Sequence, residues 1–231
     1  MMINRDVLEL IGVIIGDGSI LYGYRNEHYR MEISGNAEED QSYFLRLQKI
    51  IKNNFNKDVK IIERNHKKGK SLSLYINNRE FVEILVKKFQ IMSSPKTFTI
   101  KIPNKFLNWK LSKHIIRGIF ESDGSLYFSR SKITTKLKTY PRIEIKTCSK
   151  NLVNQLVELL KNNNFKVQTL SSKSDKCTKV YLSGENMLEK WVKEIGFSSK
   201  KNITKYLLWK KLGYYIPKST LKERESLLKS F

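Results

Sequence analysis

A short pattern occurs twice in this chain, and the two copies are separated by almost half of its length. Residues Leu10–Ile20 and Ile116–Leu126 both read apolar, small, apolar, small, Asp-Gly-Ser, apolar. The aspartates of the two copies, Asp17 and Asp123, lie 106 residues apart in a chain of 231 residues. A fold that satisfies both copies must contain two similar units.

The same spacing continues beyond the Asp-Gly pattern. Residues Arg79–Lys88 match Glu185–Glu194 at 106 residues, and Ser93-Ser94 match Ser198-Ser199 at 105 residues. Agreement at three places in one register indicates an internal duplication. We therefore predict a first repeat at residues 1–106, including a linker at about 93–106, and a second repeat at residues 107–231 that carries a C-terminal helical extension.

Alternating apolar and polar residues predict the strands of each repeat. Tyr29, Met31 and Ile33 would face a core, as would Ile143 and Ile145, which leaves polar and basic side chains on the other face. Such alternation is typical of antiparallel sheets with one solvated face, although solvent exposure alone would explain it. The predicted fold class is α+β, with two pseudo-symmetric αββαββα repeats, each containing a four-stranded antiparallel sheet.

Small residues at helical spacing predict how the two repeats meet. Gly12 and Gly16 lie on one helix face, and Gly118 and Ser122 repeat this arrangement, so the two helices can approach closely. After each helix, Gly18 and Gly124 are expected to adopt a left-handed conformation that turns the chain into a strand.

This packing would bring two carboxylates together at helix C-terminal ends. A carboxylate there opposes the helix dipole at a cost of about 0.3–1 kcal/mol, and pairing Asp17 with Asp123 adds like-charge repulsion. A divalent cation between them, Mg²⁺ or another such as Mn²⁺, would remove both costs. The carbonyls of Gly16 and Ser122, at the helix ends, are candidate additional ligands. For a single copy, an ordinary Asp-Gly turn would be the better explanation.

The charge of the chain identifies the class of partner. Forty-four Lys and Arg stand against 22 Asp and Glu, which gives a net charge of +22 and favours a polyanion such as nucleic acid. Cys148 and Cys177 lie far apart without ligand spacing, which argues against a zinc module and a disulfide framework. With no secretory signal and no apolar run long enough to span a bilayer, we expect an intracellular protein without membrane partners.

The two patterns resemble the LAGLIDADG motif of homing endonucleases, in the single-chain form with two motifs. Ile15 and Gly16 depart from the signature, but Asp-Gly is intact in both copies. The resemblance implies a saddle over double-stranded DNA, a site-specific double-strand break with short 3′ overhangs, and catalytic, metal-binding roles for Asp17 and Asp123. It also implies a role beside the attacking water for Ser34 and Lys146; a lysine that only contacts phosphate explains Lys146 equally well.

Outward strand residues and hairpin tips are the predicted DNA contacts. Arginine can bond a guanine edge, although any one of these side chains could contact only phosphate. The candidates are Arg30, Ser34, Arg64, Lys70, Arg142, Lys179 and Tyr181. An insertion around Ser131–Tyr140 lengthens the first hairpin of the second repeat and predicts an asymmetric footprint on a non-palindromic target.

Two other functions use the same fold. The chain could be a maturase that binds its host intron RNA, or a DNA-binding protein that has lost catalysis. Retention of both aspartates argues against the second. We expect a monomer, since one chain carries both repeats.

Overall fold

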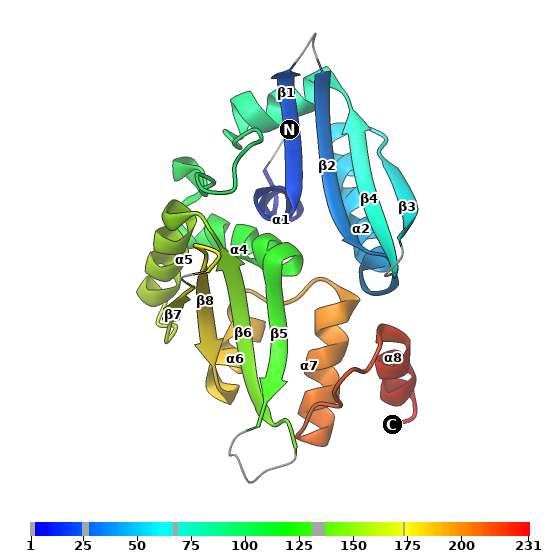
Figure 1. Cartoon of the computed structure of the whole chain (residues 1–231), viewed down its shortest axis with the longest axis vertical. Helices are drawn as coiled ribbons and strands as arrows, with labels where there is room; N and C mark the ends of the chain where they lie inside the picture. Colours follow the sequence, from blue (N-terminus) through cyan, green and yellow to red (C-terminus); the bar gives the residue numbers. More distant parts are fainter. Residues whose placement is uncertain (1–2, 25–27, 67–68, 131–136, 173) are drawn as a thin grey trace.

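The computed structural model contains two four-stranded antiparallel sheets with strand orders β1-β2-β4-β3 and β5-β6-β8-β7. It describes residues 3–24, 28–66, 69–130, 137–172 and 174–231. Figure 1 shows one sheet above the other, with helices α1 and α4 side by side between them. The predicted fold class is therefore confirmed.

The two repeats contain the same elements in the same order. The first comprises α1 (Arg5–Ile15), β1 (Gly18–Tyr24), β2 (His28–Asn36), α2 (Ala37–Phe55), β3 (Lys60–His66), β4 (Gly69–Asn77) and α3 (Arg79–Glu83), which continues as the π-helix η1 (Ile84–Lys88). After a 3₁₀ turn, η2 (Asn104–Phe106), the second comprises α4 (Trp109–Asp123), β5 (Gly124–Ser129), β6 (Tyr140–Thr147), α5 (Lys150–Asn162), β7 (Gln168–Ser171), β8 (Thr178–Ser183) and α6 (Glu185–Glu194). The C-terminal extension forms α7 (Lys200–Leu212) and α8 (Leu221–Lys229). No helix in the described ranges combines the length and apolar character needed to cross a membrane.

Helix α1 packs against α4 through glycines that leave no room for a side chain. A Cβ on Gly12 would lie 2.1 Å from the carbonyl oxygen of Ile115, and a Cβ on Gly118 would lie 2.0 Å from that of Glu9. The predicted close approach of the two motif helices is confirmed.

The expected left-handed conformation of Gly18 and Gly124 is wrong. Gly18 begins β1, and Gly124 is extended with φ −90° and ψ 166°. Glycine is required there by contact, since a Cβ on Gly18 would lie 2.6 Å from Cα of Ile14 and one on Gly124 would lie 2.4 Å from the carbonyl oxygen of Phe120.

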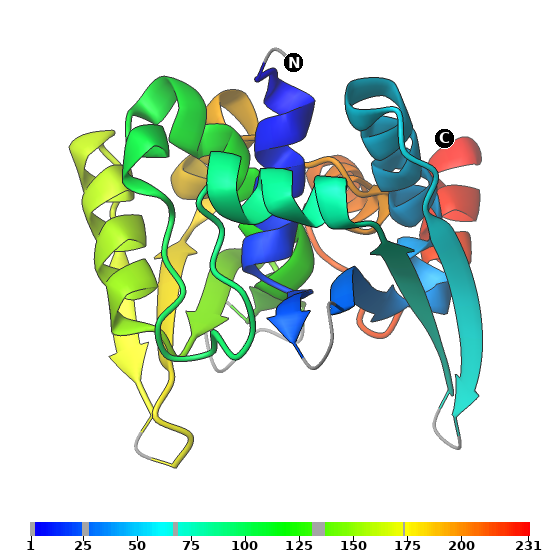
Figure 2. The same cartoon turned by 90° about the horizontal axis from the view of Figure 1, so that it is seen from above.

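Alternation along the strands places one face of each sheet against the helices. Met31, Ile33, Ile143 and Ile145 are buried, as predicted, in the core that the helices cover. Figure 2 shows the hairpins β3–β4 and β7–β8 projecting to the same side of the molecule, away from the helical layer. The outward faces of the two sheets thus form a saddle.

The C-terminal extension returns to the first repeat. The guanidinium of Arg224 on α8 lies 2.5 Å from the carboxylate of Glu39 on α2, and the backbone N–H of Leu221 donates to the same carboxylate at 3.0 Å. Lys138, in the described part of the insertion, forms a bridge with Tyr215 before α8. Residues 131–136 of the insertion lie outside the described residues, so its predicted asymmetric footprint stays a prediction.

Candidate functional site

The pairing of α1 with α4 brings Asp17 and Asp123 together. Asp17 follows the last turn of α1, and Asp123 is the last residue of α4. Their carboxyl groups lie within hydrogen-bonding reach of each other. Both residues are exposed on the saddle side. The structure therefore places the two predicted carboxylates at one point, at the foot of the glycine contact.

The proximity of these carboxyls changes their titration. Although both residues keep exposed surface, the protein around their carboxyl groups desolvates them and raises the pKa of both, and the neighbouring Asp17 charge helps to raise the pKa of Asp123 to about 7. The pair therefore holds a proton more readily than two separated aspartates would. Such a pair favours any cation that can replace this proton.

Lys96, from the segment between the repeats, occupies the C-terminal end of α1. Its ammonium group donates to the carbonyl oxygens of Ile14 at 2.6 Å, Ile15 at 2.5 Å and Gly16 at 3.1 Å. Desolvation lowers the pKa of Lys96 to about 8, although the charges of both aspartates oppose the shift. The positive charge offsets the negative end of the helix and the paired carboxylates.

A cavity of about 340 Å³ opens beside Asp123. Lys96 and Lys146 line it, and Lys146 is exposed at the end of β6. The Lys146 ammonium contacts the carboxylate of Asp175, which lies between β7 and β8. This side of the site thus presents two lysines around one aspartate.

Two cysteines lie at the rim of the same cavity. Cys148 and Cys177 form a disulfide, so the part of the prediction that argued against a disulfide is wrong. The β6–β8 pairing explains the proximity, because Thr147 lies opposite Thr178 in that register.

The side of the site around Asp17 has a different composition. Ser34 is exposed at the position on β2 that corresponds to Lys146, opposite Ser73 on β4. Lys201, at the start of α7, forms an ion pair of 2.8 Å with Asp40, and its charge opposes the rise that desolvation causes in the pKa of Asp17. The two sides therefore differ in the residues available to position a water or a phosphate.

The paired carboxylates form a suitable donor set for a hard divalent cation, which prefers oxygen ligands and keeps several waters. In the described ranges no group of three or more His, Cys, Asp or Glu side chains gathers, so other ligands would come from water or substrate. Of the two predicted carbonyl ligands, that of Gly16 already accepts a hydrogen bond from Lys96. The Ser122 hydroxyl donates back to the carbonyl of Gly118 at 3.1 Å.

Most of the predicted DNA contacts lie on the outward faces of the sheets. Pairing register places Arg30, Arg64, Arg142, Lys179 and Tyr181 there, together with Ser34. Lys70 lies on the other face of the β3–β4 hairpin, beside the position of Leu72, and pairs with Glu63 at 2.7 Å. The register therefore removes Lys70 from the set of outward side chains.

Sequence reasoning missed several charged residues around the site. Glu121, buried on α4, accepts hydrogen bonds from Ser199 Oγ at 2.5 Å and Asn202 Nδ2 at 2.8 Å, and so fixes the start of α7. Lys96 and Lys201 lie 105 residues apart, the same spacing as the matched serine pairs. That spacing was a signal that could have identified both lysines.

The sequence matches the model of one protein family. The model of the LAGLIDADG DNA endonuclease family matches residues 9–189. No curated protein matches.

Solved structures share the fold at low sequence identity. The homing endonuclease I-WcaI bound to its DNA recognition sequence has 16% identity and a TM-score of 0.58, with 86% of this chain and 84% of that chain covered. I-DmoI in complex with DNA and Mn has 18% identity and a TM-score of 0.57, with 84% and 99% covered. The N-terminal LAGLIDADG domain of DUF199/WhiA has 18% identity and a TM-score of 0.56, with 84% and 82% covered.

Proposed function

Because this chain belongs to the LAGLIDADG DNA endonuclease family, we propose that it cleaves both strands of a long, non-palindromic DNA site, using a divalent cation and leaving short 3′ overhangs. The observation that carries the proposal is the contact between the carboxyls of Asp17 and Asp123. A stable fold alone has no use for two adjoining carboxylates at helix C-terminal ends. A nuclease does, because they can hold a cation at the scissile phosphates.

The two aspartates would hold Mg²⁺ or Mn²⁺ between the repeats. When bound there, the cation would stabilise the attacking and leaving oxygens of an in-line displacement. I-DmoI was crystallised with DNA and Mn, and with DNA and Ca. Those complexes are of I-DmoI itself, and they support divalent metal use here by analogy of fold.

The lysines beside Asp123 supply the electrostatic part of the reaction. Lys146 is exposed in the cavity and can contact a phosphate oxygen or orient water, while Lys96 neutralises charge at the end of α1. Preorganised cations of this kind stabilise the negative charge that develops on the oxygens around phosphorus.

Around Asp17, the corresponding positions carry Ser34 and the Lys201–Asp40 ion pair. Both Lys146 and Lys201 pair with a carboxylate, but the uncharged Ser34 stands where the second repeat has Lys146, so this side offers one positive charge fewer. We therefore expect the two strands to be cut at different rates, with the nick formed first on the strand served by Asp123 and Lys146.

The test uses a plasmid library that carries random candidate sites. Wild-type protein with Mg²⁺ should convert some plasmids to linear DNA, and sequencing of the ends should show 3′ overhangs. Asp17→Asn and Asp123→Asn should each lower double-strand cleavage by about a hundredfold or more and keep DNA binding.

Asp58→Asn is the matched control, because Asp58 is exposed and the ion pair found for it is the one with Lys52 on the surface. This variant should cut like the wild type. Cleavage by both Asp17→Asn and Asp123→Asn at the wild-type rate would show that the paired carboxyls are not the catalytic centre.

A further inference from the structure

The outward faces of the two sheets can be compared position by position. Arg30 on β2 lies opposite Asn77, and Arg142 on β6 lies opposite Ser183. Asn77 and Ser183 are 106 residues apart, the spacing of the duplication. Arg30 and Arg142 therefore occupy the same place in the two repeats, although the longer hairpin of the second repeat shifts their sequence spacing.

The neighbours of these arginines also agree. Glu32 lies opposite Tyr75 in the first sheet, and Glu144 lies opposite Tyr181 in the second. Each sheet thus carries an arginine, a glutamate and a tyrosine at equivalent outward positions. We call these sets the arginine clusters; the first is Arg30, Glu32 and Tyr75, and the second is Arg142, Glu144 and Tyr181.

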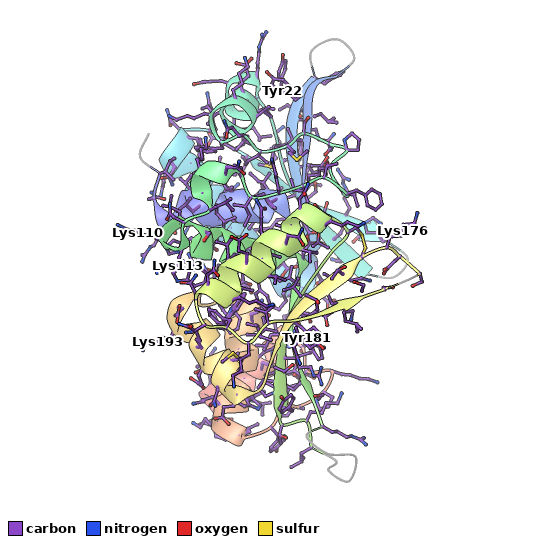
Figure 3. All side chains as sticks on the ribbon, turned by 90° about the vertical axis from the view of Figure 1, so that its left-hand side faces the viewer. Tyr22, Lys110, Lys113, Lys176, Tyr181 and Lys193 are labelled. Carbon is purple, nitrogen blue, oxygen red and sulfur yellow. A yellow bond between two sulfur atoms is a disulfide. The ribbon has the colours of Figure 1, made fainter. Side chains whose placement is uncertain are left out.

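The tyrosine rings support the guanidinium groups. The guanidinium carbon of Arg30 lies 5.7 Å from the ring centre of Tyr75, and that of Arg142 lies 6.0 Å from Tyr181 and 5.8 Å from Tyr140. Figure 3 labels Tyr181 among the side chains of the second sheet. A guanidinium held over a ring keeps its planar edge available for two parallel hydrogen bonds.

One atom of the second cluster lacks a partner. The Nε of Arg142 is buried and, in the part of the chain that the structure describes, makes no hydrogen bond. A buried N–H of a charged group without an acceptor is costly. The Arg142 side chain would have to shift for Nε to reach an acceptor on a bound molecule, and the resulting hydrogen bond would remove that cost.

We propose that Arg30 and Arg142 each read a guanine, on opposite strands and at equal distances from the centre of the target. This inference rests on the proposed function and specifies its substrate. An arginine bonded to O6 and N7 of guanine is the commonest specific contact in the major groove, and a neighbouring glutamate can accept from the amino group of cytosine. Because the two repeats have the same topology and meet through equivalent helices, their arrangement is pseudo-symmetric, and equal side chains at equal positions would read an inverted repeat.

The positions next to the catalytic centre show no such agreement. Ser34 in the first repeat corresponds to Lys146 in the second, and Ser73 corresponds to Lys179. The base pairs nearest the cleavage point are therefore read differently in the two halves. The target as a whole is non-palindromic, with one G·C pair repeated in inverted orientation farther out.

The two clusters differ in one contact, which sets their relative strength. In the first cluster the carboxylate of Glu32 contacts Arg30 itself. In the second, Glu144 pairs with Lys179 at 2.9 Å. Arg30 must leave a carboxylate to bond a base, so its guanine preference is the weaker of the two.

The experiment is selection of bound duplexes from a random pool, with the full-length chain and Ca²⁺ in place of Mg²⁺. The expected motif contains two guanines on opposite strands at equal distances from its centre. Arg30→Lys and Arg142→Lys keep the positive charge but lose the planar fork. Each should lower the preference for guanine about tenfold, at its own position only.

Arg5→Lys is the control, since Arg5 is exposed at the N-terminal end of α1, the end of the helix opposite Asp17. It should leave both guanine preferences intact. A motif without paired guanines, or a uniform loss of affinity in Arg30→Lys and Arg142→Lys, would assign these arginines to phosphate and overturn the inference alone. Selection of no duplex sequence would overturn the proposed function as well.

Discussion

Glu9 of α1 and Arg117 of α4 form an ion pair of 2.8 Å between the two repeats, and the Glu9 side chain has no exposed surface. Arg46 and Tyr43, both on α2, complete the environment at 2.7 Å and 2.9 Å from Oε1 of Glu9. A carboxylate inside an apolar helix is tolerable only with such partners. The contact fixes the register of α1 against α4, and with it the meeting of the two aspartates.

Because Glu9 is fully buried, its removal should cost much more than the loss of an exposed ion pair. Glu9→Ala leaves two arginines without their shared carboxylate and should lower the free energy of unfolding by about 3 kcal/mol. Urea unfolding measures the loss. Asp6→Asn is the control, because Asp6 binds the same Arg46 at 2.9 Å with 39% of its side chain exposed, and should cost less than about 1 kcal/mol. Equal costs for both variants would contradict this view of the contact between repeats.

The glycine contact predicts which substitutions can be rescued. A Cβ on Gly12 meets the backbone of Ile115, whereas a Cβ on Gly16 meets Oγ of Ser122 at 2.1 Å. Gly16→Ala should lower the unfolding free energy by about 1–3 kcal/mol, and addition of Ser122→Ala should restore most of it. The Cβ of Gly12→Ala would clash with backbone atoms, which no substitution can shorten, so this variant should stay destabilised when Ser122→Ala is added. Thermal unfolding of the four variants, each glycine substitution with and without Ser122→Ala, distinguishes these outcomes. Rescue of Gly12→Ala by Ser122→Ala would exclude a local clash.

The duplication predicted the fold because each repeat obeys local rules that a sequence displays. Alternating residues such as Met31 and Ile33 indicated strands, and glycines at helical spacing indicated the α1–α4 contact. The same reasoning placed Asp17 beside Asp123 without coordinates.

Other features depend on contacts that no local pattern records. The Asp17-Gly18 pair predicts a turn with Gly18 in a left-handed conformation. The structure instead requires glycine at position 18 because a side chain there would clash with Ile14. Lys96 fills the end of α1 from a distant segment. Cys148 and Cys177 meet because β6 and β8 are neighbours. For Lys96 and the two cysteines the partner is brought by tertiary packing, whereas for Gly18 it is the last turn of the preceding helix, whose path past residue 18 the Asp-Gly pattern does not specify.

Lys205 on α7 predicts a specific dependence of stability on pH. Desolvation lowers its pKa to about 8 from 10.5. Among the described residues, the hydrogen bond found for its ammonium group is a long one of 3.5 Å to the carbonyl of Leu126. The charged groups that face it are Arg224, Lys201, Glu39 and Asp40. Above pH 8 the folded chain has lost this proton while the unfolded chain still binds it. Stability should therefore rise between about pH 8 and 10.5.

Lys205→Met should remove this dependence. The variant should be more stable than the wild type at pH 7, by about 1–3 kcal/mol, and the difference should disappear toward pH 10.5. Urea unfolding at several pH values gives the difference directly, because other titrating groups are common to both proteins. A wild-type chain that is the more stable at pH 7 would show that the ammonium group makes a favourable contact there.

We predict that the carboxylate of Asp175 lowers the affinity of the chain for DNA. It contacts Lys146 at the rim of the cavity beside Asp123, and this contact lowers the pKa of Asp175 to about 2. The group is therefore charged at every working pH, and it opposes an approaching phosphate while it occupies the lysine. Asp175→Asn should raise affinity for duplex DNA about threefold at low salt, and the gain should shrink as salt screens the charge.

The control for Asp175→Asn is Glu194→Gln, which removes the same charge from α6 in the helical layer, where Glu194 pairs with Lys190. Because this residue lies behind the sheet, its loss should change affinity much less. Titration of labelled duplex at two salt concentrations separates the cases. If Asp175→Asn weakens binding instead, the carboxylate positions Lys146 for the phosphate, and the ion pair is part of the binding surface rather than a competitor for it.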